Sequence, residues 1–335
     1  MNRVTLRKTI VACAVLAAAL LLAIVLMSLL GSEALPVRAS LCALASFGAS
    51  PCGLTQDQFA ILFQIRLPRI LLAASVGGSL ATAGAGYQAL LRNPLAEPYL
   101  LGISNGAAVG TMIALVFFGS IEWTRPILAF SGALVATFAV YQLARGRTGA
   151  TPERLILAGV IVTTFLSSVI VFVTVLMDAT RIRSFTFWLL GDLSGASKAL
   201  LPLTIVITIV GVLALTLHAR SLNLLMLGER DAFDLGVEVG RVRILVFLVA
   251  SLLVGSSVAA SGSVGYVGLV VPHLARLSLG SDNRISIPAA ALGGALFVIV
   301  ADTVARTIIA PRELPVGAIT ALIGAPLFIY LLRRA

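Results

Sequence analysis

Asp302 and Arg306 are ionisable residues within an otherwise apolar segment, FVIVADTVARTI (297–308). Their spacing of four residues places both side chains on one face of a helix, where they can form an ion pair. Ionisable residues inside a membrane also serve as proton relays in carriers. The sequence therefore leaves two interpretations of Asp302 open: a structural ion pair, or the coupling site of an ion-coupled secondary transporter.

The motifs that support nucleotide hydrolysis or covalent catalysis are absent from the sequence. Neither lysine, Lys8 nor Lys198, follows a glycine, which excludes a phosphate-binding G-x-x-x-x-G-K-[ST] loop. The two histidines, His218 and His273, are far apart, so they form no H-E-x-x-H motif, and no G-x-S-x-G nucleophile elbow occurs. We therefore expect no catalytic residues, no cofactor and no metal site in this chain.

The composition is that of a membrane protein. The chain has 335 residues, of which 59% are hydrophobic and 11% charged, and its mean hydropathy is +1.07. Soluble domains carry about 25% charged residues. The uncharged run between Lys8 and Glu33 exceeds the roughly 20 residues that a membrane span needs. It is also longer than the hydrophobic region of about 7–15 residues in a signal peptide, so we interpret it as a retained helix.

Nine further apolar stretches predict an all-α, polytopic protein with about ten transmembrane helices, because only intrahelical bonds satisfy a lipid-exposed backbone. These stretches cover 70–91, 100–118, 126–144, 155–177, 199–217, 242–260, 264–279, 285–309 and 315–332. With the N-terminus inside, most of the 24 Lys and Arg residues fall in cytoplasmic loops, including Arg3, Arg7 and Lys8. The charge distribution therefore predicts that both termini are cytoplasmic. It also explains the net charge of +10 without nucleic-acid binding.

The segment RNPLAEPYLLGISNGAAVG (92–110) places charged, polar and proline residues between two apolar stretches. Pro94 and Pro98 cannot continue a helix, so the segment predicts a sharp cytoplasmic connection. After it, glycines recur every fourth residue, a pattern that lets membrane helices approach closely. We expect this packing face at Gly102, Gly106 and Gly110.

Two further segments stand out from the apolar background. SGSVGYVGLVVPHLAR (261–276) combines three glycines with Pro272 and predicts an interrupted, tightly packed half-span. LGERDAFDLGVEVGRVR (227–243) is the longest predicted cytoplasmic loop and mixes charges with apolar residues on either side of Gly236. It can form one or two short amphipathic helices, and the pattern fits a solvated loop and a protein-docking surface equally well.

Cys42 and Cys52 fall in the first predicted outer loop. An oxidising periplasm permits a disulfide there. The alternative of two unpaired thiols stays open at this point.

Six motifs in order give the chain a family resemblance from about residue 60 to its end. They are QIRLPRILLA, LLRNPLAEPYLLGISNGAAVG, LILAGV, GYVGLVVPHLARL, ADTVART and ELPVGAITALIGAPLFIYLLRR. Together they resemble the permease subunits of ABC importers for iron chelates, haem and cobalamin, with a pattern close to the B12-type members.

The resemblance implies one transmembrane permease domain over residues 1–335, located in the bacterial inner membrane. It also implies a homodimer in contact with membrane lipid, two cytoplasmic ATP-binding subunits and a periplasmic substrate-binding protein, with no enzyme activity in the permease itself. The expected cargo is a ferric siderophore, haem or cobalamin, and no nucleic acid is involved.

The resemblance also assigns candidate site residues. In the family, external arginines that receive acidic residues of the binding protein match Arg66, Arg69 and Arg306. The cytoplasmic gate matches two turns, Asn93, Pro94 and Leu95 together with Thr151, Pro152 and Glu153. The short coupling helices that press on the ATPase match residues 227–238, and the positions carried over are Leu227, Gly228, Glu229, Arg230, Asp231, Phe233, Leu235 and Gly236.

Overall fold

The structure is a computed structural model that describes residues 6–119, 123–146, 149–195 and 200–333. Of the basic residues discussed above, Arg3 and Lys198 lie outside these ranges. The described chain is almost entirely helical. Its α-helices are α1 (Leu6–Leu29), α2 (Val37–Ala45), α3 (Gln56–Ala60), α4 (Leu67–Leu90), α5 (Ile103–Ile113), α6 (Thr124–Ala144), α7 (Pro152–Leu176), α8 (Ala179–Leu189), α9 (Leu200–Leu217), α10 (Ala219–Leu227), α11 (Glu229–Asp234), α12 (Val239–Ser261), α13 (Val267–Leu279), α14 (Asn283–Thr307) and α15 (Val316–Leu332).

Short irregular elements connect some of these helices. The π-helical segments η1 (Ile61–Arg66) and η3 (Ala114–Phe118) continue α3 and α5, and the 3-10 turn η2 (Pro98–Leu101) precedes α5. The strands β1 (Arg145–Gly146) and β2 (Gly149–Ala150) pair antiparallel, with Arg145 opposite Ala150.

Among the described residues, seven helices are long and apolar enough to cross a membrane, and three shorter apolar helices accompany them. The shorter ones span Ile103–Phe118, Val267–Leu279 and Val316–Leu331. These helices coincide with the apolar stretches of the sequence, which confirms the all-α membrane class. The number of complete crossings stays a prediction.

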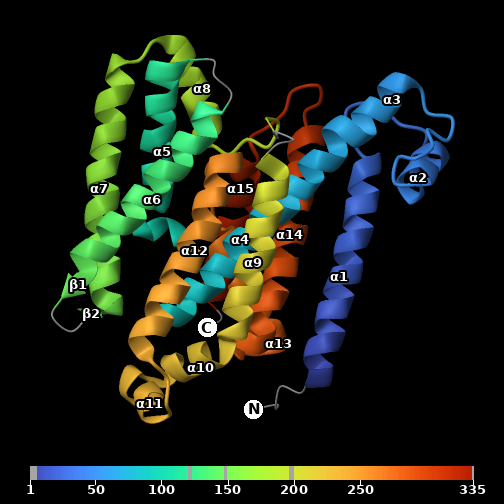
Figure 1. Ribbon diagram of the computed structural model, residues 1–335. Helices are drawn as coiled ribbons and strands as arrows, with labels where there is room; N and C mark the ends of the chain where they lie inside the picture. Colours follow the sequence, from blue (N-terminus) through green and yellow to red (C-terminus); the bar gives the residue numbers. More distant parts are fainter. Residues whose placement is uncertain (1–5, 120–122, 147–148, 196–199, 334–335) are drawn as a thin grey trace.

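Helix α4 forms the centre of the bundle (Figure 1). It packs against α14, α12, α13 and α9, and almost every residue of 72–90 is buried. A second group, α5, α6 and α7, joins this core through the contact of α6 with α12, while α1 packs along α14. The small residues of α4, chiefly alanine and glycine, allow so many neighbours to approach one helix.

The bundle has two ends that matter for the candidate site (Figure 1). We call them the α3 end, where α3 and the α7–α8 connection lie, and the α11 end, where α10, α11 and the β1–β2 hairpin lie. Helix α4 runs from the α3 end to the α11 end, and the two sets of candidate residues are found at opposite ends.

Cys42 and Cys52 form a disulfide in the segment between α1 and α4, with a Cα–Cα distance of 5.9 Å. The bond joins α2 to the turn before α3. The structure thus selects the paired arrangement of the two that the sequence left open.

Candidate functional site

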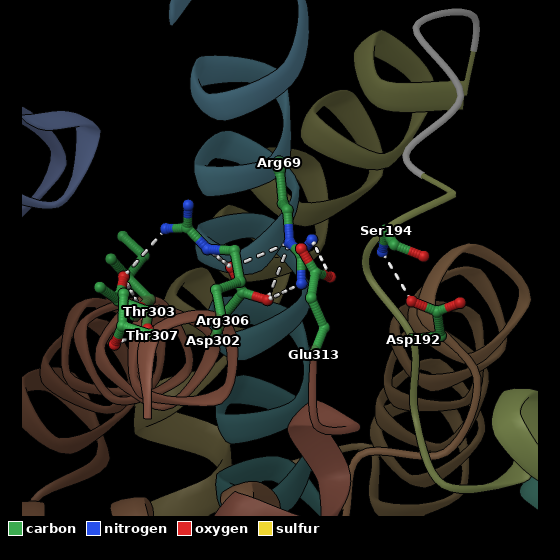
Figure 2. A network of polar contacts seen from close by, with 9 residues as sticks. Arg69, Asp192, Ser194, Asp302, Thr303, Arg306, Thr307 and Glu313 are labelled. Atoms are coloured by element: carbon green, nitrogen blue, oxygen red, sulfur yellow. Dashed lines mark hydrogen bonds and ion pairs between the residues drawn. The ribbon is translucent and has the colours of Figure 1, made fainter. Parts of the chain in front are cut away.

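Arg69 and Arg306 share one buried carboxylate at the α3 end (Figure 2). Arg69, in the first turn of α4, donates from Nε and Nη2 to Asp302 Oδ1 at 3.0 and 2.9 Å, and from Nη1 to Glu313 Oε2 at 2.7 Å. Arg306 Nε lies 3.1 Å from Asp302 Oδ2, across one turn of α14. Asp302 is only 1% exposed, so its charge requires these partners.

Arg66 lies at the same end but outside this network. Its guanidinium donates to the carbonyls of Ser28 and Leu29 at 3.2 and 3.3 Å and to that of Glu33, and so holds the end of α1. Arg66, Arg69 and Arg306 are all buried. Their docking role stays a prediction, and in this structure each guanidinium already has partners within the chain.

Asp302 and two further aspartates, Asp178 and Asp192, have structural functions here. Asp302 anchors two arginines, which gives no support to a proton-coupling site. Asp178 accepts from Arg181 N as the N-cap of α8, and Asp192 accepts from Ser194 N at 2.7 Å in a local turn (Figure 2).

The segment after α4 explains the odd composition of residues 92–110. Arg92 adopts φ 50°, and Asn93 Oδ1 accepts from Leu95 N at 2.9 Å, which closes the turn that contains Pro94. Glu97 then accepts from Tyr266 N at 3.1 Å, at the start of α13. These contacts turn the chain sharply at the α11 end, as the prolines predicted.

The two glycine-rich segments pack against each other. Tyr99 OH donates to Val264 O and accepts from Val264 N, both at 2.9 Å, and Gln88 Nε2 donates to Gly268 O at 3.2 Å. The interrupted half-span at 261–276 therefore has its free backbone groups satisfied by polar side chains of the 88–99 region, which is how irregular backbone persists inside a membrane protein.

The three glycines of the predicted packing face have two different functions in the structure: two allow close helix packing, and one begins a helix. A Cβ on Gly106 or Gly110 would lie 2.4 or 1.9 Å from a carbonyl oxygen of α6, so both allow the α5–α6 contact. Gly102 has φ 74°, begins α5 as its N-cap and lies against Val162 of α7 instead.

The coupling-helix candidates form a short exposed element at the α11 end. Helix α11 covers Glu229–Asp234 and ends before Gly236, whose φ of 84° reverses the chain. Ala232 is buried, but Leu227, Phe233 and Leu235 are 67%, 71% and 62% exposed. Their role in contacting an ATPase stays a prediction.

Arg243 is a residue that sequence reasoning missed. It lies early in α12 and is buried, forms an ion pair with Glu229, and donates from Nη1 to Ala150 O at 2.6 Å. Glu229 also lies 3.6 Å from Arg92 Nη2. The sequence signal for this residue was its position, since Arg243 is a charged residue at the start of the predicted apolar stretch 242–260.

Asp282 fixes α10 to α14 at the same end. It accepts from Arg284 and from Asn223 Nδ2, and these hydrogen bonds, led by those from Arg284, lower the pKa of Asp282 to about 2. Because this pKa is depressed, the stabilisation is present above the ordinary pKa of 3.8 and is lost only as the pH falls toward 2.

Within the described ranges, no group of three His, Cys, Asp or Glu residues could hold a metal ion.

Known proteins are similar to this chain in sequence and in architecture. The chain is 44% identical over 282 residues to the cobalamin import system permease protein BtuC of Halobacterium salinarum, covering 84% of this chain and 75% of that protein. It is 41% identical over 280 residues to the hemin transport system permease protein HmuU of Yersinia pestis, covering 82% and 83%. A solved structure described as an inward-facing ABC transporter assigned to the metal-chelate type matches with a TM-score of 0.83 and 30% identity, over 98% of this chain and all of that one.

These matches confirm the family resemblance drawn from the six motifs, and they agree with a multi-pass protein of the inner membrane. A family model described as the FecCD transport family covers residues 14–334. The chain therefore belongs to the FecCD transport family, whose matched members are permease subunits of ABC importers.

Proposed function

We propose that this chain is the membrane permease of an ATP-driven importer for a ferric siderophore, haem or cobalamin. The observation that carries the proposal is the separation of the two candidate surfaces. The arginine network lies at the α3 end, and the exposed apolar residues of α11 lie at the opposite end. An importer driven from the cytoplasm needs a substrate-delivery surface on one side and an ATPase surface on the other.

In this proposal, both termini are cytoplasmic, ten helices cross the membrane, and residues 1–335 form one permease domain. The α3 end then faces the periplasm, where the Cys42–Cys52 disulfide is stable. A periplasmic binding protein docks at Arg66, Arg69 and Arg306, and two ATP-binding subunits dock at residues 227–238.

A second copy of the chain completes the path for the cargo. Helix α7 exposes large apolar side chains along its length, among them Phe165 and Phe172. Three of its hydroxyls, those of Thr164, Ser168 and Thr174, bond to carbonyls one turn earlier in the helix. Two such helices facing each other form a wide path with few specific ligands, which suits a large cargo. Membrane lipid covers the remaining apolar faces.

The experiment that tests this function is uptake into proteoliposomes that contain the chain with its ATPase and binding protein. Radiolabelled cobalamin, haem and a ferric siderophore are supplied separately, with and without ATP. We expect ATP-dependent uptake of one of them, and weaker uptake with Arg66→Gln, which removes one arginine of the predicted docking set and leaves the Asp302 network intact. Uptake that follows a proton gradient and ignores ATP would contradict the proposal.

Replacing Phe233 by aspartate should detach the ATPase from the permease. A charge at this position cannot be buried in an apolar interface without a partner, so we expect affinity for the ATPase to fall about tenfold or more. Co-purification from detergent measures the loss. The matched control is Phe47→Asp, which places the same change on a 94% exposed phenylalanine at the α3 end. Equal retention of the ATPase by both variants would remove α11 from the interface.

A further inference from the structure

The carboxylate of Glu229 joins three segments that are distant in the sequence. Glu229 is the first residue of α11. It lies 3.6 Å from Arg92, which directly precedes the gate turn Asn93–Leu95. It also pairs with Arg243, which in turn holds the carbonyl of Ala150 at 2.6 Å, directly before the gate turn Thr151–Glu153.

The two connections differ in strength. The side chain of Arg243 is 8% exposed and that of Glu229 35%, so the charge of Arg243 is largely removed from water and depends on its partner. Arg92 is 36% exposed and lies farther from the carboxylate, so solvent screens this pair. The connection of Glu229 through Arg243 to the turn Thr151–Glu153 is therefore the stronger one, and its connection through Arg92 to the turn Asn93–Leu95 is the weaker one.

We propose that Glu229 is a positioning residue that transmits movement of α11 to both gate turns, mainly through Arg243 and secondarily through Arg92. This inference rests on the proposed function, since it takes α11 as the ATPase surface and the two turns as the gate. It assigns Glu229 to the inner side of the interface, where it acts on the permease itself, and it adds Arg243 to the coupling machinery. Phe233 and Leu235 supply the contact with the partner.

The test measures gate movement directly and needs no cargo. Single reporters, Glu153→Cys and Leu95→Cys, are placed in a Cys13→Ser background, and their rates of maleimide labelling are compared in the permease–ATPase complex with and without a non-hydrolysable ATP analogue. Both positions are exposed. With Glu229→Gln, we expect the nucleotide response at Glu153→Cys to fall about fivefold or more, and that at Leu95→Cys to fall less.

The matched control is Arg241→Gln. Arg241 lies two residues before Arg243 on the same helix, but it pairs with Glu238 and both of these side chains are exposed. This variant should keep the full nucleotide response. A second comparison distinguishes loss of the link from a folding defect. In Glu229→Gln the buried charge of Arg243 loses its partner, whereas the double variant Glu229→Gln/Arg243→Gln leaves no unpaired buried charge. If the two residues act as one link, the double variant should respond no less than either single variant.

Each outcome decides the question. An undiminished nucleotide response in Glu229→Gln and in the double variant would overturn the proposal. Loss of the ATPase from the Glu229→Gln complex would also overturn it, since Glu229 would then be a docking residue. The absence of any nucleotide response in the two reporter proteins themselves would refute the proposed function, and the inference with it, whereas normal reporters with an unresponsive Glu229→Gln support both.

Discussion

Replacing Asp302 by alanine should destabilise the protein by about 3–5 kcal/mol, the usual cost of removing one partner from a buried ion pair. The carboxylate is 1% exposed and neutralises two guanidiniums that are themselves buried. Its removal leaves Arg306 with Thr303 as a neutral partner and leaves Arg69 with Glu313 only. The same change therefore loosens the contact of α4 with α14, while the ion pair of Arg69 with Glu313 remains.

Reversible unfolding of the purified protein in mixed detergent, followed by tryptophan fluorescence, measures this effect. Glu238→Gln serves as the control, because it removes an ion pair with Arg241 that is exposed on both sides and should cost no more than about 1 kcal/mol. Combining Asp302→Ala with Arg69→Met should cost less than the sum of the single variants, since each removes the partner of the other. Equal, small effects of Asp302→Ala and Glu238→Gln would show that the network does not hold the helices together.

A second substitution at this position, Asp302→Asn, separates the two interpretations of Asp302. A proton-coupling carboxylate, when neutralised as Asp302→Asn, would leave a folded protein that no longer transports. A structural carboxylate would lower the folded yield and the transport together, with the uptake per folded molecule largely retained. The contacts of Asp302 favour the second result.

Local sequence rules predicted part of this network and could not predict the rest. The four-residue spacing of Asp302 and Arg306 was sufficient to expect their ion pair. Arg69, however, is 233 residues away from Asp302, and only the packing of α4 on α14 brings them together. Arg243 and Ala150 meet in the same way, across 93 residues, which is why the link at the α11 end was missed.

The helices, too, were predicted in part from the sequence, and the rest could not be predicted. Long apolar stretches identified the membrane helices, because the length of an apolar run decides their location. Helix α8 has 11 residues, with Arg181 and Arg183 among them, and α2 has only 9 residues, so neither gave a signal of this kind. The glycine repeat indicated close packing at Gly106 and Gly110. The same repeat could not reveal that Gly102 is a turn residue, because its φ of 74° depends on the preceding η2 segment.

Replacing Gly77 by leucine should have the other large effect on stability. Even the Cβ of a new side chain would lie 2.1 Å from the carbonyl oxygen of Gly294, and Gly294 meets Gly77 O in the same way at 2.3 Å. A backbone atom cannot move aside as a side chain does, so α4 and α14 must separate. We expect a cost of at least about 1–3 kcal/mol for alanine and more for leucine.

Gly240→Ala is the matched control, since Gly240 lies in a helix and a Cβ there would meet no atom within 4 Å. It should be neutral or slightly stabilising, because alanine is the better helix former.

Gly77 lies about two turns after Arg69 in α4, and Gly294 lies about two turns before Asp302 in α14, roughly 12 Å along each axis. The two contacts are thus successive points of one antiparallel helix pair. Gly77→Ala and Asp302→Ala should therefore both lower stability through the same interface, and a Gly77→Ala variant as stable as Gly240→Ala would show that α4 and α14 do not pack as closely as this register requires.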